Sequence, residues 1–121
     1  MSLYSLCIRL FPEALRISTG AAIAAAGGAY IGIGTTLDNP SRILYLLNGT
    51  DVLLLFSYDG ITDHQALPSN GFLLLDVSAN SSVSQGFFIA QGQRIYVRYP
   101  GAAPTTGSVY LSTYYGAGGT I

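Results

Sequence analysis

The chain has 121 residues, of which 50% are hydrophobic and only 9% are charged, and all five of its basic residues are arginine. This length predicts one domain, and a net charge of −1 without lysine argues against nucleic acid as a partner, because phosphate binding needs a basic surface. So few charges predict that sister subunits cover part of the exterior, and we expect a homo-oligomer, either a dimer or a trimer.

The first 28 residues join an apolar head to a run of small residues. Residues 18–34 carry no charge, but alanine and glycine insert weakly into a membrane, and no basic residue precedes Arg9 as a signal peptide would require. Neither membrane insertion nor export is therefore predicted, and the stretch forms either a short alanine helix or an extended arm. We expect residues 1–28 to be an N-terminal interaction arm, and residues 29–121 to be the β-sandwich domain.

The arm also supplies the candidate interface residues. Its apolar side chains need a covering surface, and its two arginines are suited to pairing with carboxylates of a neighbouring chain. If the head packed on its own domain, the pliable glycines behind it would cost conformational entropy without need. The predicted interface residues are Leu3, Leu6, Arg9, Leu10, Phe11 and Arg16.

From residue 38 onward, short apolar runs alternate with turn residues. The expected strands are residues 42–48, 52–58, 71–77, 86–91, 94–99 and 108–115, with a tight hairpin turn at Asn48-Gly49 and a loop at residues 59–70. Residues 29–36 and 14–18 add two strands. About eight strands without a helical period predict an all-β fold, an antiparallel β-sandwich that is jelly-roll-like.

No motif in the sequence predicts a catalytic, cofactor or metal site. The glycines of residues 27–34 precede no helix, so they indicate close packing and not a dinucleotide loop. Asp59, Asp63 and His64 share one loop, where a turn is favoured over a cation site. A single cysteine, Cys7, gives no disulfide or zinc site, and no enzymatic activity is expected. The strand tyrosines leave a carbohydrate-binding module open as an alternative.

Between residues 33 and 115 the chain resembles a group of small virion structural proteins of tailed bacteriophages. The similar segments are IGTTLDNPSRILYLLNGTD, FSYDGITDHQALPSNGFLLLD, GQRIYVRY and GSVYLSTYY. The resemblance implies a jelly-roll or similar sandwich that is located in the virion and binds other virion proteins. Capsid decoration or cement, with the major capsid protein as partner, is the first expectation. A head–tail or tail component is the second, and a host-attachment carbohydrate module is the alternative.

Overall fold

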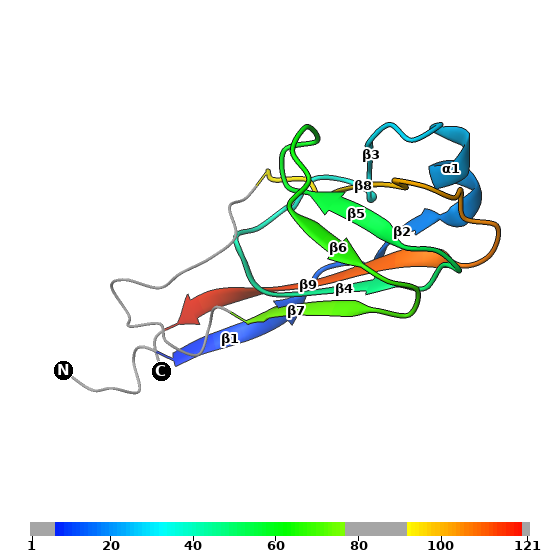
Figure 1. Cartoon of the computed structure of the whole chain (residues 1–121). Coiled ribbons are helices and arrows are strands. Elements are labelled where there is room, and N and C mark those ends of the chain that lie inside the picture. Colours follow the sequence, from blue (N-terminus) through cyan, green and yellow to red (C-terminus); the bar gives the residue numbers. More distant parts are fainter. Residues whose placement is uncertain (1–6, 77–91, 120–121) are drawn as a thin grey trace.

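Two antiparallel β-sheets stack face to face in the computed structural model, which describes residues 7–76 and 92–119 (Figure 1). The expected all-β sandwich is thereby confirmed. The strand expected at residues 86–91 lies outside the described residues. Within the described ranges, no helix is long and apolar enough to cross a membrane.

The two sheets divide the strands unequally. Sheet A has five strands in the order β1-β9-β4-β7, with β2 also paired to β9: β1 (Cys7–Pro12), β2 (Arg16–Thr19), β4 (Ser41–Asn48), β7 (Phe72–Asp76) and β9 (Ser108–Gly119). Sheet B has four strands in the order β3-β8-β5-β6: β3 (Ile31–Gly32), β5 (Leu54–Ser57), β6 (Gln65–Leu67) and β8 (Tyr96–Arg98).

The strand order is that of a jelly roll. The pairs β2·β9, β3·β8, β4·β7 and β5·β6 are nested, so the chain forms one long antiparallel hairpin that is rolled into two sheets. Strands β1 and β2 pair with opposite ends of the long strand β9, and they form one edge of sheet A that is interrupted at residues 13–15. Counted as one strand, they give the eight strands of the roll.

The core lies between the two sheets and is built by alternation. In β8 the buried Val97 alternates with the half-exposed Tyr96 and Arg98, as expected from the sequence. Leucine, isoleucine and valine from both sheets fill the space between them. The fully buried members are Ile23, Ile33, Leu44, Leu46, Leu54, Phe56, Ile95, Val97, Val109 and Leu111.

The alanine-rich stretch forms a short helix, α1 (Gly20–Ala25), which is one of the two alternatives that the sequence left open. Thr19 caps its N-terminus by accepting a hydrogen bond from the Ala22 N–H at 3.2 Å. Gly27, with φ of 68°, follows the helix and can adopt this left-handed conformation without a steric penalty. The helix contributes the fully buried Ile23 to the core.

The boundary expected at residue 28 is not a boundary of this fold. Within residues 7–28, β1 and β2 pair with β9, and Ile23 lies in the core. The described part of the head therefore pairs within its own chain, as a sheet edge. A contribution of residues 1–28 to assembly stays a prediction.

The hairpin expected at Asn48-Gly49 is wrong, because the strands on either side of it belong to different sheets. Neither residue has a positive φ, which the tight hairpin turn would need. The left-handed conformation occurs instead at Asn70, with φ of 64°, in a turn that the Gly71 N–H closes on the Pro68 carbonyl at 2.8 Å. The expected loop at residues 59–70 also contains β6, which pairs with β5.

Candidate interaction surface

One face of sheet A points away from sheet B and carries large apolar side chains. In β4, the buried Leu44 and Leu46 alternate with outward side chains, because successive residues of a strand point to opposite faces. The register of β2, β7 and β9 places their own outward residues beside those of β4. We call this surface the apolar face, and we define it by Leu15, Ile17, Tyr45, Phe72, Leu74 and Tyr114.

The apolar face is exposed over most of its area. Apart from the partly buried Tyr45, exposed fractions of its members range from 37% for Tyr114 to 60% for Phe72. The rings of Tyr45 and Phe72 stack with 5.6 Å between their centroids. At the paired outward positions of the described strands, the one carboxylate is Asp76, opposite Ile43 at the end of β7. In Figure 1 no labelled element lies below sheet A, whereas sheet B covers its upper side.

Sequence reasoning missed this surface, although the sequence contained a signal for it. The runs FLLLD in β7 and RILYLL in β4 are apolar at successive positions, and strands of this kind are typically covered on both faces. Here sheet B covers only the inner face. Among the residues that the structure describes, no other strand or helix covers the outer side chains (Figure 1).

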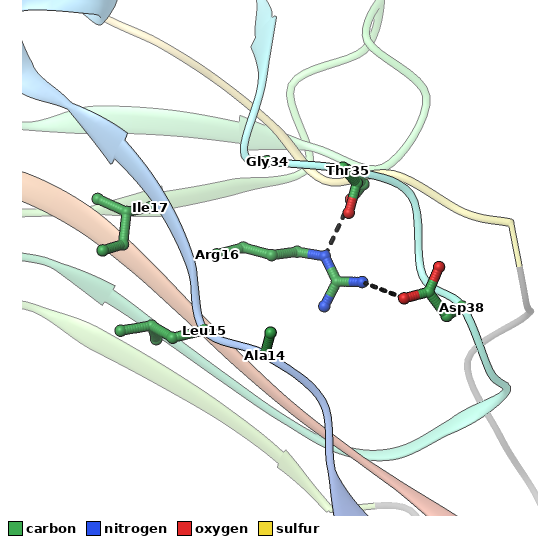
Figure 2. A pocket seen from close by; sticks show the side chains of 7 residues that line it. All are labelled: Ala14, Leu15, Arg16, Ile17, Gly34, Thr35 and Asp38. Carbon is green, nitrogen blue, oxygen red and sulfur yellow. Dashed lines mark hydrogen bonds and ion pairs between the residues drawn. The ribbon is translucent and has the colours of Figure 1, made fainter.

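Arg16, expected at an interface, is instead an internal residue and is only 6% exposed. Figure 2 shows its side chain pointing away from Leu15 and Ile17, toward the segment that contains Thr35 and Asp38. Its guanidinium donates to the Thr35 carbonyl at 3.0 Å and pairs with the Glu13 carboxylate at 2.9 Å. Because these partners belong to its own chain, Arg16 is not available to pair with a neighbour.

Glu13 completes this buried charge cluster. Its carboxylate accepts hydrogen bonds from Asn39 at 2.9 Å and Thr113 at 3.2 Å in addition to Arg16. Burial acts to raise the pKa of Glu13, but the hydrogen bonds from Asn39 and Arg16 and the positive charge of Arg16 outweigh it, so the pKa lies below its ordinary value. An open pocket of about 210 Å³ beside the cluster is lined by Ala14, Leu15, Arg16, Ile17, Gly34, Thr35 and Asp38 (Figure 2).

Two glycines, Gly32 in β3 and Gly34 just after it, leave room for two arginine side chains, which confirms that these glycines serve close packing. Gly34 has φ of 64°, and a Cβ there would lie 2.8 Å from the Arg16 Cβ. A Cβ on Gly32 would overlap the guanidinium of Arg94, which donates to the Gly34 carbonyl at 2.9 Å. Neither glycine opens a helix, so the arrangement is not that of a dinucleotide loop.

The structure describes the side chains of two of the remaining predicted interface residues, Leu10 and Phe11. Leu3 and Leu6 are outside the described residues, and of Arg9 only the pairing of its backbone in β1 is described. Leu10 and Phe11 are exposed to 44% and 39%. The Phe11 ring stacks on Tyr115 with 5.5 Å between the centroids. Both side chains are thus placed at the surface, where an interface residue has to be.

The acidic loop is built as a turn, as expected. Asp59 accepts hydrogen bonds at 2.8 Å from the backbone N–H groups of Ile61 and Thr62, and these bonds, with one from the Ser57 hydroxyl, hold its pKa far below the ordinary range. The carboxylate of Asp63 turns away to other partners. Among the described residues, no three His, Cys, Asp or Glu side chains form a group that could hold a metal ion.

Asp63 ties this loop to sheet B. The Arg98 guanidinium donates two hydrogen bonds to the Asp63 carboxylate, of 3.1 Å and 2.9 Å, and the Tyr30 hydroxyl donates to the same carboxylate. The hydrogen bonds from Arg98 and then Tyr30 lower the pKa of Asp63. The guanidinium also lies over the Tyr30 ring at 5.5 Å, and Arg94 lies over the Tyr96 ring at 5.8 Å.

His64 is part of the same turn, where it contacts Tyr58 and Phe56. Its Nδ1 accepts a hydrogen bond of 3.1 Å from the Tyr58 N–H, and its ring tilts against the Tyr58 ring. The backbone N–H of His64 donates to the Phe56 carbonyl at 2.9 Å. The imidazole therefore helps to fold the loop back onto the end of β5.

No protein-family model matches this chain, and no curated protein or solved structure matches it either. Its function is therefore argued from the surface described above and from the residues themselves.

Proposed function

We propose that this protein is a non-enzymatic structural component of a tailed-phage virion, in the first place a capsid decoration or cement protein. It would stabilise the particle by protein–protein contacts, with the major capsid protein as its main partner. The observation that carries the proposal is the exposed apolar face of sheet A. Contiguous apolar surface of this kind marks an interaction site in a soluble protein.

The energetics of the apolar face suit a stable contact. Fully burying a large apolar side chain contributes about 1.5–3 kcal/mol, so covering one that is half exposed contributes about 1 kcal/mol. Five members of the face are exposed by a third to two thirds. Covering them together provides enough free energy to hold a protein partner without a catalytic or cofactor group.

Two further observations support this proposal. The turn and strand motifs from residue 33 to residue 115 resemble small virion structural proteins, and the jelly roll that this resemblance implies is the fold of the chain. Because one fold serves many functions, the resemblance of the motifs carries more weight than the fold. His64, the one histidine of the sequence, is engaged in a hydrogen bond of its own loop.

The proposal is tested by locating the chain in purified particles. Mass spectrometry of the particles should detect it in stoichiometric amounts, and its jelly roll should fit density on the outer capsid surface in an electron cryo-microscopy map. Density at the neck or tail would support the second assignment, a head–tail or tail component. A chain that is abundant in the infected cell but missing from purified particles would refute a virion role.

A carbohydrate-binding module for host attachment is the alternative. Sugar stacking needs a free aromatic face, and at two tyrosines, Tyr30 and Tyr96, an arginine guanidinium already lies over the ring. A glycan array distinguishes the two functions. Binding that disappears in Tyr96→Ala but persists in Leu74→Lys would favour the carbohydrate module.

A further inference from the structure

We infer that the apolar face binds a second copy of this chain, so that two sandwiches pack back to back through sheet A around a two-fold axis. The inference rests on the proposed function in one respect, namely that the apolar face buries protein. It replaces the expected choice between dimer and trimer with a dimer, and it moves the interface from the N-terminal residues to the centre of sheet A.

The area of the apolar face matches what a dimer needs. Six large side chains of about 150–200 Å² each, roughly half exposed, offer on the order of 500 Å². The partly exposed Ile43, Leu47 and Tyr110 lie between them on the same face and add to this area. Specific interfaces bury about 800 Å² on each partner, so a face of this extent is large enough when the polar rim is included.

The charge of the face selects the second copy over other partners. At its described paired positions, the apolar face holds one carboxylate, Asp76, and no arginine. Arg42 stands at the irregularity of β4 next to Ile43 and is partly buried, so the paired positions themselves offer no cation to an anionic membrane or nucleic acid. A neutral apolar surface is complementary to itself, since a two-fold axis brings the same side chains together without opposing like charges at the centre.

The geometry of β-sheets allows the same arrangement. Two twisted sheets pack face to face about 10 Å apart with their strands within about 30° of each other, and their side chains interdigitate. The apolar face extends across the width of sheet A, from Ile17 on β2 to Leu74 on β7. No other described element covers it (Figure 1). In the dimer, sheet A would be covered on both sides, as its continuous apolar runs require.

Sedimentation equilibrium of the full chain tests the inference directly. The wild-type protein should be a dimer at about 100 µM and dissociate only at low micromolar concentration or below. Leu74→Lys and Ile17→Lys each place two charges in the dimer interface, so each should raise the dissociation constant at least about 100-fold. Circular dichroism checks that both variants remain folded, which is expected because both side chains are already about half exposed.

Ile61→Lys is the matched control, because Ile61 is 85% exposed but lies in the loop after β5, away from sheet A. It should leave the dissociation constant unchanged. A wild-type monomer at about 100 µM, or a dimer that Leu74→Lys and Ile17→Lys weaken no more than Ile61→Lys does, would overturn the inference.

The outcomes also separate this inference from the proposed function. A wild-type monomer whose capture by particles is lost in Leu74→Lys would mean that the apolar face binds another virion protein. The dimer would then be refuted and the virion role retained. A dimer that depends on Leu74 but is missing from particles would support the dimer and refute the virion role.

Discussion

At the scale of single residues, Asn48 shows how one polar side chain can hold the two sheets in place. It is fully buried, and its amide nitrogen shares hydrogen bonds with the carbonyl oxygens of Val52, Leu67 and Pro68, at 2.9, 2.9 and 3.1 Å. Its oxygen accepts from the backbone N–H and the hydroxyl of Thr50. The side chain thus satisfies backbone groups at the point where the chain leaves sheet A for sheet B. These buried groups need hydrogen-bond partners, and no water can replace the Asn48 side chain there without a cavity.

We predict that Asn48→Ala lowers the free energy of unfolding by about 3 kcal/mol, because each buried polar group left without a partner costs about 1–3 kcal/mol. The measurement is urea denaturation followed by circular dichroism. Asn70→Gly is the control, since Asn70 is exposed, has a positive φ and lies in the neighbouring turn. It should change the stability by less than about 0.5 kcal/mol. Equal stability of Asn48→Ala and wild type would contradict the role assigned to this amide.

The same residue shows why local sequence patterns misplace a turn. Asn48-Gly49 has the composition of a tight hairpin turn, but the pattern does not say whether the asparagine side chain faces solvent or the core. In this protein the Asn48 side chain faces the core, because the strand that follows belongs to the other sheet. Asn70-Gly71, a second such pair, has the positive φ instead.

At the scale of elements, most strands could be predicted from alternation and turn spacing, whereas β1 and β6 could not. Residues 42–48 and 108–115 were predicted within a few residues of β4 and β9, since each has a buried row at every second position. β6 has only three residues, too few for a period to be visible. β1 lies at an edge, and its partner β9 is about 100 residues away in the sequence.

The pairing of the N-terminal strands leads to a prediction that opposes the expected arm. Deleting residues 1–28 removes β1, β2 and α1, exposes one side of β9 and takes Ile23 out of the core. We expect the shortened chain to show no cooperative thermal transition by circular dichroism. Ile23→Ala in the full chain should lower the free energy of unfolding by about 2–4 kcal/mol. Cooperative melting of the shortened chain near the temperature of the full chain would restore the interpretation of residues 1–28 as an arm.

At the scale of the whole molecule, the class of fold could be predicted from turn spacing and alternation, but the surface could not. Whether an outward leucine such as Leu74 is covered depends on which strands share its sheet and on what lies above them. The register that places Leu74 beside Tyr45 links residues that are far apart in the sequence. Low charge led to the hypothesis of self-association, which stays a prediction. Composition contains no position, so the predicted interface residues were taken from the N-terminal segment and did not include the apolar face.

Acid should destabilise the whole molecule, because several of its carboxylates join loops that are distant in sequence. Asp51 accepts hydrogen bonds from the hydroxyl and backbone N–H of Thr105, which lower its pKa to about 2, and Glu13, Asp59 and Asp63 also have lowered pKa values. A carboxyl whose pKa is lower in the folded state stabilises the fold above its unfolded pKa, of about 4, and this contribution is lost as the pH falls through the folded pKa.

We therefore predict a melting temperature that is constant from neutral pH down to about pH 5 and that falls steadily between about pH 4 and pH 2. Asp51→Asn should melt at a lower temperature than wild type at neutral pH, and its decline in acid should be shallower, because one of the titrating groups has been removed. Thr105→Val tests the same contact from the other side, since it removes the hydroxyl that contributes most to the lowered pKa of Asp51. A wild-type melting temperature that stays unchanged down to about pH 2 would show that these carboxylates do not stabilise the fold.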